Sequence, residues 1–355
     1  MNSIITPCFV MQSKKLQNNL NRLVELERAT GVKILHTLKS FNQDSVLPTI
    51  GSILSGMSIS TVDEFKMAKI AHAQHLHLYV PAYKEEVLTQ LAHQVSTLSF
   101  NSMSQWERFK NYHTKTSVGL RINPKLHLPI PSYCNPNLSQ SRLGIDYLEF
   151  LEHHNANPKF FLALEGLHFH ALYQSSAEGV WILLDHISTH YQQILPRLKW
   201  INLGGGHNFT DKNYDTKHFI STVQTFNQKH PHIQLYFEPG ESVVKDTGDF
   251  ICTVLDITTI NGVDVTILDT SIETHLLDVA IVNQRLKVQG TQNSSTPYYY
   301  ELAGNSCLQG DTIGEYFFQM PLSVGDKIIF EDMMGYSMVK TTQFNGMELA
   351  RFVLN

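Results

Sequence analysis

The sequence predicts an α/β protein in which a (β/α)8 TIM-like barrel is followed by a second, mainly β C-terminal domain. Between residues 12 and 240, short apolar segments alternate regularly with helical patterns, which is typical of β/α units that build a parallel sheet. Eight such segments over roughly 200 residues fit a closed barrel better than an open sheet. After Pro239 the alternation gives way to β-branched runs separated by turn residues, which indicates a β domain.

The barrel strands are predicted where a segment is short, apolar and bounded by polar or turn residues. These segments are Lys33–Leu38, Met57–Ser60, Leu76–Val80, Thr97–Phe100, Val118–Ile122, Leu164–His170, Trp200–Leu203 and Leu235–Phe237. A first helix is expected at about Ser13–Thr30, and patterns such as Val62–Ile70 and Trp181–Ile187 repeat apolar residues at helical steps. No G-x-G-x-x-G follows the first strand, so an open dinucleotide-binding sheet is not indicated.

We therefore assign residues 12–240 to the barrel, and residues 1–11 with 241–355 to the β domain. Its strand candidates, separated by Asn-Gly and Gly-Asp turns, are Phe250–Ile257, Asp264–Leu268 and Asp326–Phe330, and Cys8–Met11 is expected to join them. The polar segment Gln289–Thr296 is predicted to be a surface loop.

Composition describes an ordinary globular protein of two domains. The 355 residues are 42% hydrophobic and 17% charged, with a net charge of -5, so no basic patch favours nucleic acid as a partner. The amino terminus lacks a signal peptide pattern, and no stretch is apolar for long enough to span a bilayer. A cytoplasmic protein is expected.

Neither cysteine nor histidine spacing predicts a metal site. Cys8, Cys134, Cys252 and Cys307 are far apart and form no C-x-x-C pair, which excludes a disulfide framework as the basis of the fold. His72, His75 and His77 cluster without a carboxylate at ligand spacing, so we interpret them as ordinary surface histidines rather than zinc ligands.

Four motifs fall at the carboxyl ends of predicted strands, where barrel enzymes carry their active sites. They are Lys39, His168-Phe169-His170, Gly204-Gly205-Gly206 and Glu238-Pro239-Gly240-Glu241. A lysine at a strand end either reaches solvent or serves as a neutral amine. The three glycines form either a flexible turn or a backbone approach to an anion ahead of a helix.

Together these motifs meet the requirements of pyridoxal phosphate. The cofactor needs a lysine for a Schiff base, a loop for its phosphate, a ring to stack on and a group facing its ring nitrogen. A carboxylate such as Glu238 favours the protonated ring nitrogen, which makes the ring a strong electron sink after bond cleavage at Cα. An arginine there would suit racemisation, so Glu238 predicts decarboxylation.

The same order of motifs resembles the fold-type III pyridoxal phosphate decarboxylases, of the alanine racemase/ornithine decarboxylase-like fold, which include ornithine and diaminopimelate decarboxylases. The resemblance spans nearly the whole chain, because it also covers Arg121–Pro124, Ser141–Gly144, Cys307–Asp311, Tyr336 and Phe344–Gly346. Within that superfamily, residues 168–172, 238–241, 304–311 and 338–346 are most similar to the carboxynorspermidine decarboxylases.

The resemblance implies roles for the cofactor-binding residues. Lys39 would form the Schiff base, His170 would stack on the cofactor ring, and Glu238 would pair with the ring nitrogen. The glycines Gly204, Gly205 and Gly206, with Tyr336, would hold the phosphate.

It also implies a homodimer with shared active sites, because Cys307 would come from the partner subunit and return a proton to the carbon that loses carbon dioxide. Asp269, Asp278 and Asp311 are candidates for the amino groups of a polyamine-like substrate, and the alternative for each is a turn or a helix cap. Glu241 stands where ornithine-type enzymes have a phosphate-binding arginine, so we expect it to turn from the phosphate toward protein groups or substrate.

Two departures from the family pattern concern the substrate tail. Tyr173-Gln174 replaces an expected Cys-Glu pair, and His275–Asp278 replaces an expected His-Met-Pro-Asp. The predicted function is a carboxy-lyase of polyamine biosynthesis that converts carboxynorspermidine or carboxyspermidine to norspermidine or spermidine. The alternatives are a decarboxylase of ornithine or diaminopimelate, a pyridoxal phosphate carrier without turnover, and a barrel enzyme that uses Lys39 without a cofactor.

Overall fold

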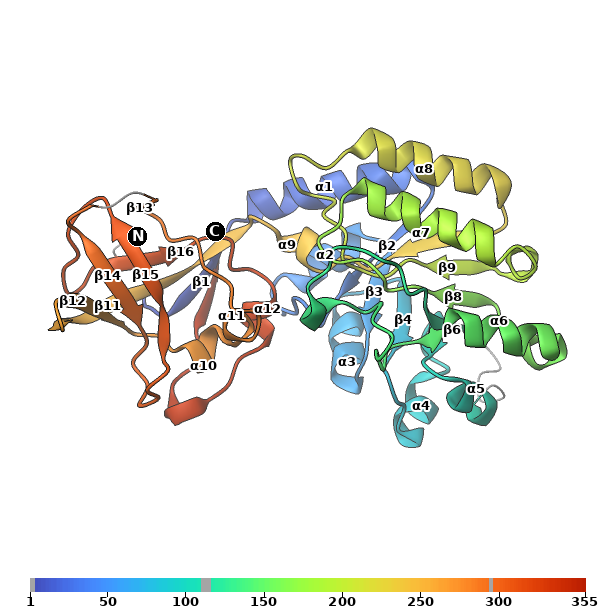
Figure 1. Ribbon diagram of the computed structural model, residues 1–355, viewed down its shortest axis with the longest axis horizontal. Helices are drawn as coiled ribbons and strands as arrows, with labels where there is room; N and C mark the ends of the chain where they lie inside the picture. The colour runs from blue at the N-terminus through green and yellow to red at the C-terminus, as the bar shows by residue number, and fades with distance from the viewer. Residues whose placement is uncertain (1–3, 110–115, 294–295) are drawn as a thin grey trace. The chain divides into compact units, whose positions relative to one another are not determined.

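The computed structural model describes residues 4–109, 116–293 and 296–355. The chain divides into two compact units (Figure 1), of which one is Asn19–Val243 and the other is Met1–Asn18 with Val244–Asn355. Met1–Ser3 of the segment assigned to the β domain, and Ser294 and Ser295 of the expected polar loop, lie outside the described residues. No helix of the described chain has the length and apolar character needed to cross a membrane.

The first unit is built on eight parallel strands that close into a barrel. They are β2 (Lys33–Thr37), β3 (Gly56–Ile59), β4 (His75–Tyr79), β5 (Thr97–Phe100), β6 (Ser117–Asn123), β8 (Gly166–His168), β9 (Trp200–Asn202) and β10 (Gln234–Phe237). The strand order is β5-β4-β3-β2-β10-β9-β8-β6, and pairing of β5 with β6 closes the ring. All eight predicted strands and the barrel are confirmed. The two-residue strand β7 (Ile145–Asp146), which pairs with β6, was not predicted.

Helices surround the barrel, as the alternating pattern requires. They are α1 (Ser13–Thr30), α2 (Leu47–Ile53), α3 (Val62–Ile70), α4 (Glu85–Leu91), α5 (Met103–Phe109), α6 (Tyr147–Ala156), α7 (Ala177–His190), α8 (Thr216–Lys229) and the single turn α9 (Glu241–Val244). Short 3-10 turns occur at Ser132–Cys134, Pro158–Phe161 and Leu195–Arg197. Figure 1 shows α7 and α8 side by side on the outside of the strands.

The amino-terminal end of the barrel interior is filled by large rings that glycines accommodate. The ring of Trp200 lies 6.5 Å from that of Tyr236, which stacks on His75 at 4.6 Å. A Cβ atom at Gly166 would lie 2.0 Å from the Trp200 ring, and one at Gly119 would lie 2.4 Å from it. Because real Cβ atoms do not approach so closely, the tryptophan requires glycine on β8 and on β6, the next two strands on one side of β9.

The second unit is a mainly β structure, as predicted. Its strands are β1 (Cys8–Met11), β11 (Gly248–Ile260), β12 (Val263–Leu268), β13 (Thr291–Gln292), β14 (Tyr299–Ala303), β15 (Thr312–Phe318), β16 (Lys327–Phe330) and β17 (Arg351–Leu354). The sheet order is β13-β15-β14-β12-β11-β1-β17, with β16 paired to β11. Both ends of the chain meet here, since β1 runs parallel to β17.

Turn chemistry sets the register of this sheet. Asn261 and Gly262 join β11 to β12 with φ of 51° and 82°, the left-handed pair that a tight Asn-Gly hairpin needs. The short helices of the unit are α10 (Ile272–His275), α11 (Leu277–Val282) and α12 (Tyr336–Val339), with a 3-10 turn at Phe344–Gly346. The prediction that Gln289–Thr296 is only a loop was wrong, because it contains β13, which pairs with β15.

Candidate functional site

Lys39 lies two residues beyond the end of β2, at the carboxyl end of the barrel. Its side chain is exposed to solvent, yet the protein packed around the ammonium lowers its pKa by desolvation. The nearby Arg121 guanidinium lowers the pKa further, whereas Glu238 and Glu64 act in the opposite direction. A lysine with a lowered pKa is closer to the neutral amine that attacks a carbonyl carbon.

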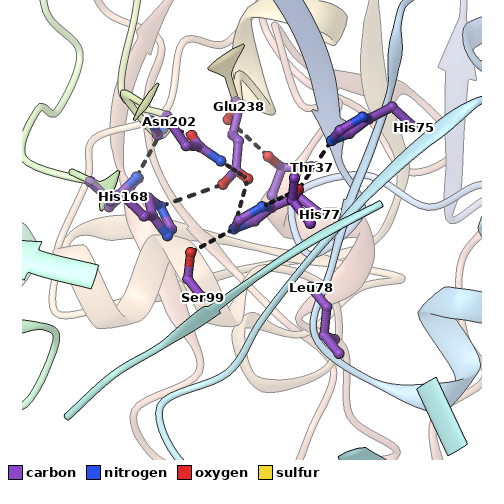
Figure 2. Close-up of polar contacts among 12 residues, drawn as sticks. Thr37, His75, His77, Leu78, Ser99, His168, Asn202 and Glu238 are labelled. Carbon is purple, nitrogen blue, oxygen red and sulfur yellow. Dashed lines mark hydrogen bonds and ion pairs between the residues drawn. The ribbon is translucent and has the colours of Figure 1, made fainter. Parts of the chain in front are cut away.

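Glu238 directly follows β10 and is 8% exposed. Figure 2 shows its carboxylate between side chains from several strands. The amide nitrogen Nδ2 of Asn202 donates a hydrogen bond of 2.7 Å to Oε1. Nε2 of His77 lies 3.9 Å from Oε1, and Nε2 of His168 lies 3.9 Å from Oε2. Burial raises the pKa of Glu238, while the hydrogen bond from Asn202 and the charge of Lys39 favour the ionised form.

Seven of the eight barrel strands each contribute a buried polar residue to the surroundings of this carboxylate, which itself follows the eighth, β10. In chain order the seven are Thr37, Ser58, His77, Ser99, Arg121, His168 and Asn202. Inward-facing positions of such barrels are usually filled by bulky apolar residues. The polar interior therefore indicates that this barrel is built around a buried charge.

His170 follows β8, and its Nδ1 accepts a hydrogen bond of 2.8 Å from the backbone N–H of Gly205. A Cβ atom at Gly204 would lie 2.7 Å from that imidazole, and one at Gly206 would lie 2.0 Å from the carbonyl oxygen of Leu172. Gly204 and Gly206 also have φ of 67° and 84°. The turn therefore requires glycine, both for its backbone conformation and for its packing around His170.

The glycine turn differs from the prediction in two respects. Its N–H groups are partly used within the chain, because Gly204 donates to Asn202 Oδ1 at 2.8 Å and Gly205 donates to His170. The helix predicted after the glycines is present as α8, but it begins only at Thr216, so it does not continue directly from the turn.

The chemistry of the barrel mouth fits pyridoxal phosphate. Arg121 is 4% exposed, and its Nε and Nη2 atoms have no hydrogen-bond partner among the described residues; both ring nitrogens of His168 are in the same situation. Buried polar atoms without partners are costly, so a ligand rich in oxygen and nitrogen suits this interior. The amine of Lys39, the imidazole of His170 and the buried carboxylate of Glu238 also lie after the carboxyl ends of β2, β8 and β10, as an anionic pyridine aldehyde requires.

Five predicted site residues lie in the second unit, namely Cys307, Tyr336 and three aspartates. Cys307 is exposed on the turn after β14, and its N–H donates a 2.7 Å hydrogen bond to Asn345 Oδ1. Tyr336 begins α12, where the Lys340 ammonium lies 4.6 Å from the centre of its ring.

The three candidate aspartates differ in how many partners they have. Asp269 accepts from the backbone of Thr253 at 2.7 Å and from the Thr6 hydroxyl at 2.5 Å. Asp311 is 4% exposed and accepts from the backbone N–H groups of Ile272 and Ser306. These two carboxylates are engaged in holding loops of the β unit.

Asp278 differs, because only Oδ2 is engaged, by the Ser337 hydroxyl at 3.0 Å. Its Oδ1 has no hydrogen-bond partner in the part of the chain that the structure describes. Burial raises the pKa of this carboxyl. Of the three, Asp278 has an oxygen left for an amino group. The neighbouring His275 is fully buried. Its ring nitrogens form hydrogen bonds with the Thr270 hydroxyl and the Glu348 carbonyl, so His275 holds these two segments together.

Glu241 is the exposed first residue of α9. Burial and the Cys134 thiol raise the pKa of the nearby Tyr173 hydroxyl, and the charge of Glu241 raises it further. Tyr173 is the residue that replaces a cysteine of the family pattern, so one departure from that pattern lies near Glu241.

Sequence reasoning missed the barrel interior. The prediction that His77 lies on the surface was wrong, because it is 1% exposed and faces Glu238. His168 and Asn202 were likewise not recognised as neighbours of the carboxylate. Their signal was the two-residue period of strands: each stands two residues before a predicted site residue, His168 before His170 and Asn202 before Gly204. No cluster of three metal-ligating side chains occurs within residues 4–109, 116–293 and 296–355.

Comparison with known proteins agrees with this geometry. Residues 14–245 match the pyridoxal binding domain of pyridoxal-dependent decarboxylases, and residues 198–334 match the C-terminal sheet domain of such enzymes. The chain is 35% identical to carboxynorspermidine/carboxyspermidine decarboxylase of Campylobacter jejuni, over 99% of this chain and 93% of that protein. It is also 35% identical to carboxyaminopropylagmatine decarboxylase of Synechocystis, over 98% of this chain and 89% of that protein.

A solved structure gives the same result. Carboxynorspermidine decarboxylase from Campylobacter jejuni, complexed with norspermidine, superposes with a TM-score of 0.89 at 34% identity, covering 99% of this chain and 94% of that chain. The barrel, the sheet domain and the resemblance predicted from the sequence are thereby confirmed. The chain belongs to the pyridoxal-dependent decarboxylases and is a pyridoxal phosphate-dependent enzyme.

Proposed function

We propose that this enzyme removes the α-carboxylate of carboxynorspermidine or carboxyspermidine, releasing carbon dioxide and the triamine norspermidine or spermidine. The observation that carries the reaction type is Glu238, a buried carboxylate held by Asn202 at the carboxyl end of β10. The substrate class is supported by full-length similarity to relatives named for it. Carboxyaminopropylagmatine is a second candidate, because the Synechocystis relative is equally similar.

In this proposal the barrel residues bind and orient the cofactor. When bound, pyridoxal phosphate supplies an electron-withdrawing ring that stabilises the negative charge left as carbon dioxide departs. Lys39 would hold its aldehyde group, His170 would pack against its ring, and Glu238 would keep a proton on its ring nitrogen. Gly205, Gly206 and Tyr336 would hold its phosphate, and Gly204 would shape the turn that carries the two glycines.

The second unit supplies a proton and a substrate contact. The thiol of Cys307 gives its proton to the substrate carbon after carbon dioxide has left, and it acts in the active site of a partner subunit, so the enzyme works as a homodimer. The exposure of Cys307 supports this role, because an exposed thiol can reach a neighbouring subunit. Asp278 and Glu241 bind the cationic amino groups of the substrate, whereas Asp269 and Asp311 support the loops.

A product assay tests the proposed function. Purified, cofactor-loaded enzyme is incubated separately with carboxynorspermidine, carboxyspermidine, carboxyaminopropylagmatine, ornithine and diaminopimelate, and the amines formed are quantified. We expect kcat/KM for a carboxylated triamine to exceed that for ornithine or diaminopimelate by at least about 100-fold, since these amino acids have one amino group besides that on Cα where the triamine precursors have two, and a charged contact is lost. Preference for ornithine or diaminopimelate would refute the substrate class.

Replacement of the thiol tests the shared site. We expect Cys307→Ala to release carbon dioxide but to form part of its product as an aldehyde, with the substrate's amino group left on the cofactor, because the proton then reaches the carbon of the cofactor instead of that of the substrate. The ratio of aldehyde to amine measures the effect. An unchanged ratio would count against the role of Cys307.

Mixing two variants makes this test specific for the dimer. Lys39→Ala dimers lack the amine and Cys307→Ala dimers lack the thiol, but a mixed dimer holds one native site if the site is shared. Unfolding and refolding an equal mixture should give about a quarter of native sites, because half of the dimers are mixed and half of their sites are native. If the mixture forms no more amine than the two separate variants, the site is not shared.

Neutralising Asp278 tests the substrate contact. We expect Asp278→Asn to raise KM about tenfold or more with little change in cofactor affinity, because a hydrogen bond between charged groups is lost. Since burial raises the pKa of Asp278, the wild-type KM should rise as the pH falls through that pKa, and the variant should lose this dependence. Asp269→Asn is the matched control, expected to lower thermal stability and leave KM unchanged. Equal KM values for wild type and Asp278→Asn would exclude the contact.

A further inference from the structure

Two histidines of the barrel interior have no part in the function proposed above. His77 on β4 and His168 on β8 are each 1% exposed, and their rings meet edge to face with centroids 5.2 Å apart. Figure 2 shows both rings directed at the carboxylate of Glu238. Each carboxylate oxygen has one imidazole nitrogen 3.9 Å away.

These contacts join neutral imidazoles to a carboxylate. Burial lowers the pKa of His77 to about 3 and that of His168 well below its usual value. A neutral imidazole carries one N–H donor and one bare nitrogen. A bare nitrogen beside a carboxylate oxygen is repelled, whereas an N–H stabilises the ionised carboxylate. The arrangement is therefore favourable only if the proton of each ring is on the nitrogen that faces Glu238.

A hydrogen-bonded chain can fix that proton position in His77. The hydroxyl of Thr97 lies 2.8 Å from Nδ1 of His77 and 3.1 Å from Nε2 of His75. If the Thr97 hydroxyl accepts a hydrogen bond from the N–H of His75 and donates one to Nδ1 of His77, His77 must carry its own proton on Nε2. That N–H then points between the Ser99 hydroxyl, at 3.2 Å, and Glu238.

The other charged groups near Glu238 do not by themselves keep it ionised once the cofactor is bound. The ionisable groups that face it from the neighbouring elements are Lys39 after β2, Tyr79 and His77 on β4, Arg121 on β6 and His168 on β8. The proposed function commits the Lys39 amine to the cofactor. Neutral N–H donors stabilise the carboxylate without adding a cation that would compete with a protonated ring nitrogen.

We propose that His77 and His168 are positioning residues that hold Glu238 as a carboxylate facing the cofactor's ring nitrogen, and that Thr97 and His75 orient His77 for this task. The inference rests on the proposed role of Glu238. The protonation of the cofactor would then depend on five residues, four of them on β4, β5 and β8 and the fifth, Glu238, directly after β10. Without the donors, the shared proton would move from the ring nitrogen to the carboxylate and leave both groups neutral.

The test measures the protonation state of the cofactor's ring nitrogen directly. Each protein is loaded with pyridoxal phosphate labelled with 15N in its ring, and solid-state NMR reports whether that nitrogen is protonated. We expect wild type to show the protonated signal at pH 7, and His168→Phe to shift the equilibrium about tenfold toward the unprotonated signal, equivalent to one pKa unit. His168→Gln, which retains an amide N–H donor, should restore at least part of the protonated signal.

A second variant acts at a distance from the carboxylate. Thr97→Val removes the hydroxyl that orients His77 at almost unchanged volume, and it should shift the nitrogen signal in the same direction, whereas Thr97→Ser should not. His154→Phe is the control, because His154 is also buried, at 6% exposed, but packs between Phe150 and Phe161 on the outside of the barrel. It should leave the signal unchanged.

The outcomes separate this inference from the function on which it rests. An unprotonated ring nitrogen in wild type would refute the role of Glu238 itself. A protonated nitrogen in wild type that stays protonated in both His168→Phe and Thr97→Val would overturn the inference alone, and the two histidines would then serve only to pack the barrel. If His168→Phe does not fold, the result for Thr97→Val decides.

Discussion

The structure of the barrel depends on one buried carboxylate. An unpaired carboxylate is expensive to bury, and Glu238 is compensated by the Asn202 amide at 2.7 Å and by the polar side chains that the other barrel strands place around it. Asn202 has a second role, because its Oδ1 accepts from the backbone of Gly204. The same side chain therefore holds the carboxylate and begins the glycine turn, which in turn holds His170.

A buried carboxylate also holds loops together in the second unit. The carboxylate of Asp311 accepts a hydrogen bond from the backbone N–H of Ser306, in the turn that carries Cys307. It also accepts one from the backbone N–H of Ile272, at the start of α10. A Cβ atom at Gly304 would lie 2.3 Å from this carboxylate, so glycine is required there. The resemblance pointed to this segment for its cysteine, and the structure adds that the aspartate and the glycine keep the cysteine's loop in shape.

The sequence predicted those features of the molecule whose signals are local in the chain. The eight strands were predictable because each is a short apolar run bounded by turn residues, and Lys39, His170 and Glu238 were predictable because they stand where such runs end. His77 was not, because an inward polar residue in an alternating strand has the same pattern as an outward one. The difference among Asp269, Asp278 and Asp311 was also hidden, since it depends on partners such as Thr253 and Ser337 that lie far away in the sequence.

The central claim is that the Glu238 carboxylate makes the bound cofactor an effective electron sink. The most direct measurement is single-turnover release of carbon dioxide from saturating carboxynorspermidine by cofactor-loaded Glu238→Gln, compared with wild type. The glutamine has the same shape but no charge, so the variant should bind the cofactor and release carbon dioxide about 10²–10³ times more slowly. Release at the wild-type rate by the fully loaded variant would contradict the account.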